Sequence, residues 1–101
     1  MIDFWATWCG PCIVNLKELN NLGIIPNLEV YLICTNNIAD SIKVDNVFSK
    51  HKLQFENHYL KNSKIEFEPT AIPFSILVNN ESKKIEVINP TVRNLLKFIK
   101  N

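Results

Sequence analysis

Two cysteines close to the start of the chain, Cys9 and Cys12, flank a Gly-Pro pair in the segment "DFWATWCGPC". Thiols at this spacing can exchange electrons with other thiols, supply ligands to a metal or form a disulfide that stabilises the fold. The third cysteine, Cys34, stands alone in the run "LEVYLICTN", and we expect a buried, inert thiol there, with a regulatory thiol as the alternative. Three cysteines are too few for a scaffold held together by disulfides.

A metal site or a structural disulfide explains the Cys9–Cys12 pair less well than redox chemistry. Structural zinc takes four ligands, and this pair could supply only two of them. The remaining candidates are Cys34, His51 and His58, which fall on different expected elements without the spacing of a zinc knuckle. A disulfide across Gly-Pro would close so short a loop that it restrains the unfolded chain little. We therefore expect no bound metal and a redox-active pair.

The position of the pair at an expected helix start favours redox chemistry. Pro11 suits the first turn of a helix, and Cys9 immediately precedes that turn. A thiolate at a helix N-terminus is stabilised by backbone N–H groups and by the helix dipole, which lowers its pKa. Cys12, one turn inside, is close enough to displace Cys9 from a mixed disulfide, and Gly10 keeps the turn tight. Cys9 is thus the expected nucleophile and Cys12 the expected resolving cysteine.

An acidic residue, Asp3, lies within the otherwise apolar segment Ile2–Trp5. Burial raises the pKa of a carboxyl group, so that Asp3 could relay a proton to or from Cys12. The alternative is a solvated end of the strand, where Asp3 has no chemical role. Trp8 directly precedes the expected nucleophile and is expected to shield or present the disulfide, whereas Trp5 is expected in the core.

Hydrophobic patterning predicts the elements that position these residues. In chain order they are a strand at Ile2–Trp5, a helix at Pro11–Leu22, a strand at Leu28–Cys34, a helix at Asp40–Lys52, a strand within Leu53–Leu60, strands at Pro73–Asn80 and Lys83–Asn89 joined by a hairpin, and a helix at Thr91–Lys100. Asp40 and Thr91 are the expected caps of their helices. This order predicts a single α/β domain over residues 1–101, with a mixed sheet and helices on both of its faces.

Composition excludes several classes of function. The chain is 47% hydrophobic and 21% charged, with a net charge of +1, which is ordinary for a globular domain and predicts no nucleic-acid partner. Its longest apolar runs are shorter than the roughly 18–20 residues of a membrane span. Met1 leads directly into the first expected strand, so no signal peptide is expected.

The segment "DFWATWCGPC" closely resembles the active-site segment of the thioredoxin family, and "AIPFSILVNNESKKIEV" resembles the family's cis-proline strand, turn and following strand. The resemblance implies a thioredoxin-like three-layer sandwich. It also implies that Cys9 is the nucleophile, Cys12 the resolving cysteine and Asp3 the buried acid.

The same resemblance implies a substrate-binding surface. Pro73 would be the cis-proline that faces the disulfide, and the backbone of Ile72 would pair with an extended substrate segment. The rim beside the disulfide would be formed by Trp8, Gly10 and Pro11.

A longer segment before Pro73, "DSIKVDNVFSKHKLQFENHYL", is similar to the helix–strand insertion of the TlpA-like and ResA-like branch. That branch implies the bacterial periplasm or cell envelope, with a cytoplasmic reductase as the alternative. Asn15, Lys17 and Ile13 depart from the acidic, proline and basic residues of many such relatives. The family's strand ahead of "IDFW" is also missing, which implies an N-terminally truncated member.

The sequence therefore predicts a thiol-disulfide oxidoreductase, in the direction of disulfide reduction, that needs no organic cofactor. The expected partners are proteins that carry disulfides or dithiols and a redox protein that donates electrons. The alternative from a different class is a redox-inactive, truncated module that binds extended peptides through Trp8, Ile72 and Pro73.

Overall fold

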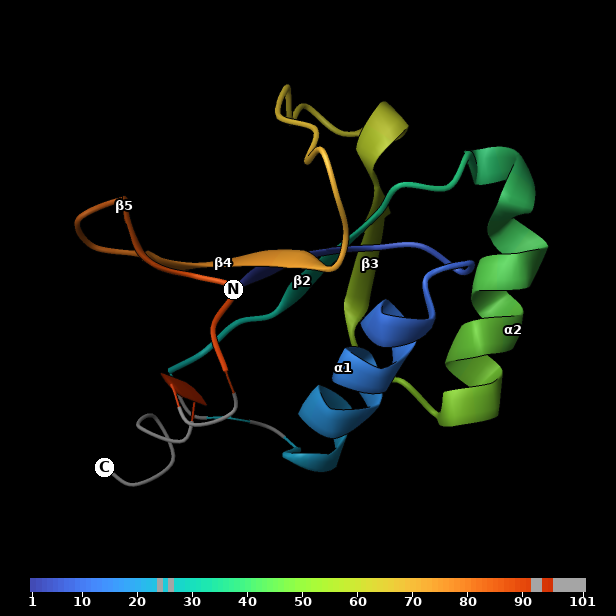
Figure 1. Cartoon of the computed structure of the whole chain (residues 1–101), viewed down its shortest axis with the longest axis horizontal. Helices are drawn as coiled ribbons and strands as arrows, with labels where there is room; N and C mark the ends of the chain where they lie inside the picture. Colours follow the sequence, from blue (N-terminus) through green and yellow to red (C-terminus); the bar gives the residue numbers. More distant parts are fainter. Residues whose placement is uncertain (24, 26, 92–93, 96–101) are drawn as a thin grey trace.

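The computed structural model of the chain describes residues 1–23, 25, 27–91 and 94–95. Figure 1 shows strands and helices in alternation, followed by a hairpin. In chain order the elements are β1 (Ile2–Trp5), α1 (Gly10–Asn21), β2 (Tyr31–Cys34), the 3-10 turn η1 (Ile38–Asp40), α2 (Ser41–His51), β3 (Glu56–Tyr59), the 3-10 turn η2 (Leu60–Asn62), β4 (Phe74–Asn79) and β5 (Lys84–Ile88).

The strands form one mixed sheet in the order β3-β2-β1-β4-β5. β1 and β2 are parallel, as are β2 and β3, whereas β4 runs antiparallel to β1 and to β5. In this register Phe4 lies opposite both Ile33 and Phe74. The mixed sheet predicted from the sequence is confirmed, and β1, which leads into the cysteine pair, lies at its centre.

Both helices α1 and α2 pack on the same face of the sheet. The side chains of Trp5, Leu32 and Cys34 point to this face and form one buried cluster with Leu16 of α1 and Val44 of α2. Two successive crossovers that advance in the same direction and have the same hand place their helices on the same side. The prediction of helices on both faces is therefore wrong for the part of the chain that the structure describes.

The opposite face is covered by the segment between β3 and β4, at residues 60–73 (Figure 1). Leu60 and Ile65 of this segment pack against Phe4 and Ile33. The ring of Phe67 lies 5.8 Å from that of Phe4, measured between centroids. Alternate side chains of a strand point to opposite faces, so β1 and β2 contribute to a core on each side.

The local sequence accounts for the ends of α1. Cys9 caps its start, Pro11 lies in its first turn, and buried Cys12, Leu16 and Leu19 follow at helical spacing. After the helix, Gly23 adopts φ +71°, a left-handed conformation that glycine tolerates best.

Asp40 precedes α2 as predicted, but its side chain makes no capping hydrogen bond. Its carboxylate instead accepts a hydrogen bond from Nδ2 of Asn36 and lies 3.9 Å from Nζ of Lys43. Asp40 thus occupies the predicted N-cap position, but the predicted hydrogen bond from its side chain to the helix is wrong. The carboxylate binds Asn36, just after β2, and not the N–H groups of the helix.

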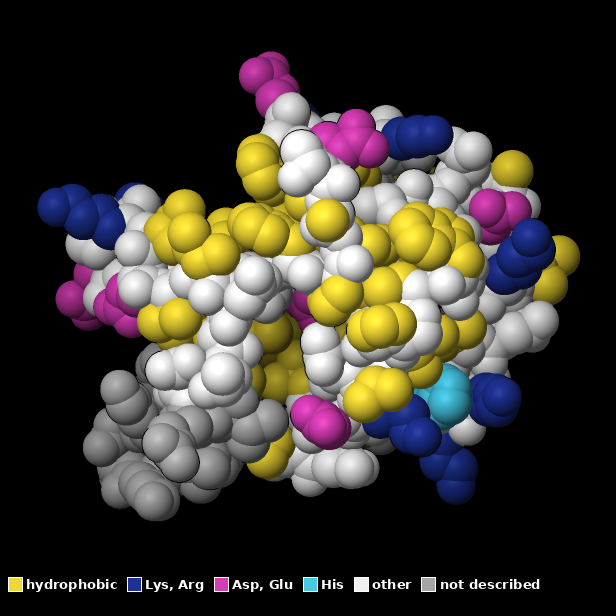
Figure 2. Space-filling model, in the orientation of Figure 1, with side chains coloured by type: hydrophobic (Ala, Val, Ile, Leu, Met, Phe, Trp, Pro, Cys, Tyr) yellow, Lys and Arg dark blue, Asp and Glu magenta, His cyan; other side chains and the backbone are white. Residues whose placement is uncertain are grey.

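The helix predicted at Thr91–Lys100 falls mostly outside the described residues. Thr91, its predicted cap, is described, and its Oγ1 accepts a hydrogen bond of 3.4 Å from the backbone N–H of Asn94. Leu95, which is described, packs with Leu19 and Ile25. No helix within the described residues is both long and apolar enough to cross a membrane. Figure 2 shows hydrophobic side chains gathered across the middle of the visible face, with charged side chains placed mainly at its periphery.

Candidate active site

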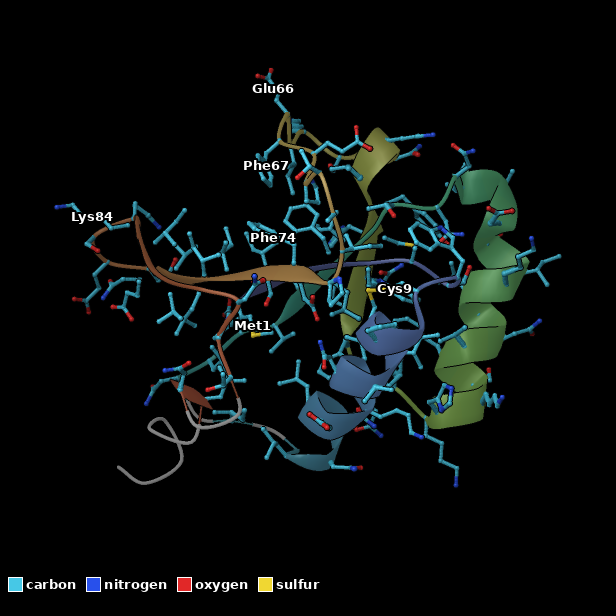
Figure 3. All side chains as sticks on the ribbon, in the orientation of Figure 1. Met1, Cys9, Glu66, Phe67, Phe74 and Lys84 are labelled. Carbon is cyan, nitrogen blue, oxygen red and sulfur yellow. A yellow bond between two sulfur atoms is a disulfide. The ribbon has the colours of Figure 1, made fainter. Side chains whose placement is uncertain are left out.

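Cys9 and Cys12 form a disulfide at the start of α1 (Figure 3). Cys9 is the N-cap residue of the helix, and its Sγ accepts a hydrogen bond of 3.2 Å from the backbone N–H of Cys12. That N–H belongs to the first turn, where helix donors have no partner within the helix. The sulfur of Cys9 thus lies at the end of the helix where backbone N–H groups and the helix dipole favour negative charge.

The disulfide is buried, but exposed residues surround it. Cys9 and Cys12 are 4% and 2% exposed, whereas Trp8 is 72% exposed. Gly10 and Pro11 are also exposed. The three residues predicted to form the rim of the site therefore lie at the surface, directly before and after Cys9 in the chain.

Asp3 is buried in the central strand, with its carboxyl on the face that carries α1. Alternation along β1 places this side chain on the same side as Trp5. Burial raises the pKa of Asp3 to about 7, because removal from water disfavours the charged carboxylate. A carboxyl group with this pKa exchanges protons near neutral pH, which a general acid or base requires.

A pocket of about 340 Å³ opens beside Asp3. Its lining includes Asn15 and Glu18 of α1 and, from the other side, Pro73 and Ser75 at the start of β4. The structure therefore brings the predicted acid and the predicted cis-proline to one cavity. Glu18 and Ser75 were not predicted as site residues. The sequence offered a signal only for Glu18, which follows Asn15 by three residues and therefore lies on the same face of the helix.

Ile72 and Pro73 lie where the covering segment meets β4. The peptide bond between them is cis. Ile72 is half-buried and packs against the cluster that contains Cys9 and Cys12, while Pro73 is exposed. The predicted substrate-binding residue Ile72 thus contacts the core cluster to which the cysteine pair belongs, although it is about 60 residues away in sequence, and Pro73 directly follows it.

Cys34, the third cysteine, is fully buried at the end of β2 and has a free thiol. Its Sγ donates a hydrogen bond of 3.2 Å to Oδ1 of Asn36. Burial raises the pKa of this thiol, which keeps it protonated near neutral pH. Within the described ranges, no cluster of three or more His, Cys, Asp or Glu side chains is placed to hold a metal ion.

No family model matches the chain. Among curated proteins, the thiol-disulfide oxidoreductase ResA of Bacillus cereus is 28% identical over 92 residues, which cover 86% of this chain and 52% of that protein. The thioredoxin-like chloroplast protein CITRX of Solanum tuberosum is 58% identical over 24 residues, or 24% of this chain and 14% of that protein. CITRX1 of Nicotiana benthamiana is also 58% identical over 24 residues, which cover 24% of this chain and 13% of that protein.

The chain thus spans about half the length of ResA and a much smaller share of the chloroplast proteins. The mixed five-stranded sheet with two helices is compatible with a thioredoxin-like fold. Taken together, the disulfide at the start of α1 and these similarities relate the chain to thioredoxin-like proteins and to a thiol-disulfide oxidoreductase.

Proposed function

We propose that the chain is a thiol-disulfide oxidoreductase that reduces protein disulfides with the Cys9–Cys12 dithiol. The observation that carries the proposal is the hydrogen bond from the Cys12 N–H to Sγ of Cys9 at the N-cap of α1. A reduced Cys9 held in this position has its thiolate stabilised by the helix terminus, and the thiolate is the reactive form. The similarity to ResA supports the same reaction class.

The exchange transfers two electrons from the dithiol to the substrate in two displacements. First, the Cys9 thiolate attacks one sulfur of the substrate disulfide, which forms a mixed disulfide and releases one substrate thiolate. Cys12 then loses its proton and attacks Sγ of Cys9, which releases the second substrate thiolate and closes the Cys9–Cys12 disulfide. The two protons of the former dithiol end on the two substrate thiols. A redox protein that donates electrons must then reduce the pair again.

Asp3 is proposed as the group that handles the proton of Cys12. With a pKa near 7, its carboxyl is present in both protonation states at neutral pH. The carboxylate form can accept the Cys12 proton in the second displacement and release it to solvent, from which the departing substrate thiolate takes up its proton. The pocket beside Asp3 gives this side chain, buried in the sheet, a route to solvent for proton exchange.

Substrate would bind as an extended segment across the exposed surface beside the disulfide. The exposed side chain of Trp8 precedes Cys9 in the chain, and Ile72 packs against the core cluster that contains Cys9 and Cys12. We propose that the backbone of Ile72 hydrogen-bonds to the substrate in the manner of an added strand, with Gly10, Pro11 and Pro73 completing the surface.

A trapping experiment tests the mechanism. Reduced Cys12→Ser should form a stable mixed disulfide with a protein that carries an accessible disulfide, because no resolving thiol remains. Cys9→Ser should form no such adduct, and Cys34→Ser, the control, should reduce insulin at the rate of the unaltered chain. The proposal is wrong if neither Cys9→Ser nor Cys12→Ser changes insulin reduction, or if the pair has no reversible redox potential, as expected of a redox-inactive peptide-binding module.

A further inference from the structure

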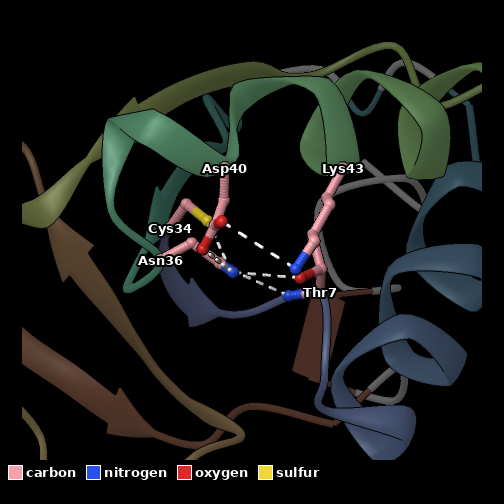
Figure 4. A network of polar contacts seen from close by, with 5 residues as sticks. All are labelled: Thr7, Cys34, Asn36, Asp40 and Lys43. Carbon is pink, nitrogen blue, oxygen red and sulfur yellow. Dashed lines mark hydrogen bonds and ion pairs between the residues drawn. The ribbon is translucent and has the colours of Figure 1, made fainter.

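The side chain of Asn36 connects the segment before the cysteine pair to the end of β2 (Figure 4). Its Oδ1 accepts hydrogen bonds from the backbone N–H of Thr7, at 2.9 Å, and from Sγ of Cys34, at 3.2 Å. Its Nδ2 donates to Oγ1 of Thr7, at 3.0 Å, and to Oδ2 of Asp40, at 3.3 Å. Asn36 is 8% exposed, so this amide is a buried polar group with partners in three segments.

The chemistry of the partners fixes the orientation of the Asn36 amide. A side-chain amide has an oxygen that accepts two hydrogen bonds and an NH₂ group that donates two, and all four are used here. The backbone N–H of Thr7 can only donate, and the carboxylate of Asp40 serves as the acceptor. A hydrophobic side chain at position 36 would leave the part-buried N–H of Thr7 without its partner, which is unfavourable.

Thr7 is the middle of the short connection that leads from β1 to the N-cap Cys9. The connection is a turn in which the N–H of Cys9 donates a hydrogen bond of 3.1 Å to the carbonyl of Ala6. Thr7 lies within this turn, and Asn36 binds it through both its backbone N–H and its hydroxyl. Two bonds to one turn residue fix the path of the backbone into Cys9 more strictly than either bond would alone.

We propose that Asn36 is a positioning residue for the dithiol: by holding Thr7, it keeps Sγ of Cys9 at the N-cap of α1, within reach of the Cys12 N–H. This inference rests on the proposed exchange reaction and deepens it. A Cys9 sulfur that moves away from the N-cap loses the stabilisation of its thiolate by the helix terminus. The thiolate fraction at neutral pH then falls, and the first displacement slows.

The pH dependence of Cys9 alkylation in the reduced full chain tests the inference. The rate for iodoacetamide is followed by mass spectrometry of the Cys9 peptide, which separates Cys9 from the other thiols. In Asn36→Ala the midpoint of the rate profile should move upwards by about half a pH unit to one unit, which lowers the rate below the midpoint roughly three- to tenfold. A merely structural role would reduce stability without moving this midpoint.

Asn20→Ala is the matched control. Asn20 also joins two segments, since its Nδ2 donates to the carbonyl of Lys52 and its Oδ1 accepts from the N–H of Gln54. It lies at the far end of α1 from the disulfide. This variant should lose stability and keep the Cys9 profile of the unaltered chain.

The inference is overturned if folded Asn36→Ala keeps the original midpoint, or if Asn20→Ala shifts it equally. If Asn36→Ala does not fold, Thr7→Val removes only the hydroxyl that Nδ2 binds; a smaller upward shift supports the inference, and an unchanged midpoint overturns it. Insulin reduction by the unaltered chain is measured in parallel. Its absence would refute the proposed function, whereas the alkylation profiles would still decide the role of Asn36.

Discussion

The indole Nε1 of Trp5 donates a hydrogen bond of 2.9 Å to Oδ1 of Asn57, which joins the central strand β1 to the edge strand β3. β2 lies between these two strands, so the hydrogen bond crosses over β2 on the face of the sheet that carries α1 and α2. Trp5 is fully buried and ends the strand that leads to the cysteine pair. Asn57 therefore satisfies a polar group in the core directly behind the site.

Asn57→Ala should destabilise the chain by about 1–3 kcal/mol, because it leaves the buried N–H of Trp5 without a partner. Urea unfolding of the oxidised protein, followed by Trp fluorescence, measures the free energy of unfolding. The control is Gln54→Ala, whose exposed side chain lies just before the same strand. A loss in Asn57→Ala no larger than in Gln54→Ala would contradict the prediction.

The raised pKa of Asp3 predicts that its contribution to stability depends on pH. The pKa is about 7 in the folded chain against an ordinary value of 3.8, so the folded state binds more protons than the unfolded state between these values. Stability from this group is therefore greatest below pH 3.8 and is lost as the pH rises to about 7, by up to about 4 kcal/mol.

Asp3→Asn should remove this dependence, because the amide has no charge to bury. The difference in unfolding free energy between Asp3→Asn and the unaltered chain should grow in favour of the variant from pH 4 to pH 8, as measured by urea titration of the oxidised proteins. Asp45→Asn, at an exposed position of α2, serves as the control. A constant difference across this range would show that Asp3 has an ordinary pKa.

Cys34 should be unreactive in the native protein. Its thiol is fully buried and its pKa is raised by that burial, so both access and thiolate formation are suppressed. The oxidised protein should show almost no reaction with Ellman's reagent under native conditions and one thiol per chain after denaturation. Rapid reaction of a native thiol would favour the regulatory role considered for Cys34.

The start of α1 was predictable because its evidence is local. The Gly-Pro pair, the helical spacing of Leu16 and Leu19 and the two cysteines all lie within a few residues of one another. The burial of Asp3 followed from the apolar residues on both sides of it in Ile2–Trp5. In both places, the residues that determine the local structure are close neighbours in the sequence.

The side of the sheet that α2 covers was not predictable in the same way. It depends on β3 pairing beside β2, and β3 is a short strand of polar residues, ENHY, with no strong pattern. The role of Asn36 was hidden for a related reason, since an asparagine after a strand is typical of a turn. Its partner Thr7 lies 29 residues earlier in the chain, and only the folded chain brings the two together.

Phe67 should affect substrate binding without affecting the chemistry of the dithiol. Its ring packs on those of Phe4 and Phe74, with centroids 5.8 and 5.6 Å away, and thereby holds the segment that carries Ile72 and Pro73 (Figure 3). Aromatic pairs of this kind contribute about 0.5–1.5 kcal/mol each. Phe67→Ala should loosen that segment and leave the start of α1 in place.

The expected result for Phe67→Ala is a several-fold rise in KM for a protein disulfide, with little change in the rate for a small aromatic disulfide that needs no extended binding surface. Steady-state kinetics with both substrates separates the two effects. Ile85→Ala, which truncates an exposed apolar side chain on β5, is the control for lost hydrophobic surface. Equal losses for both substrates would show that the covering segment supports the cysteine pair itself, because a defect confined to docking spares the substrate that does not dock.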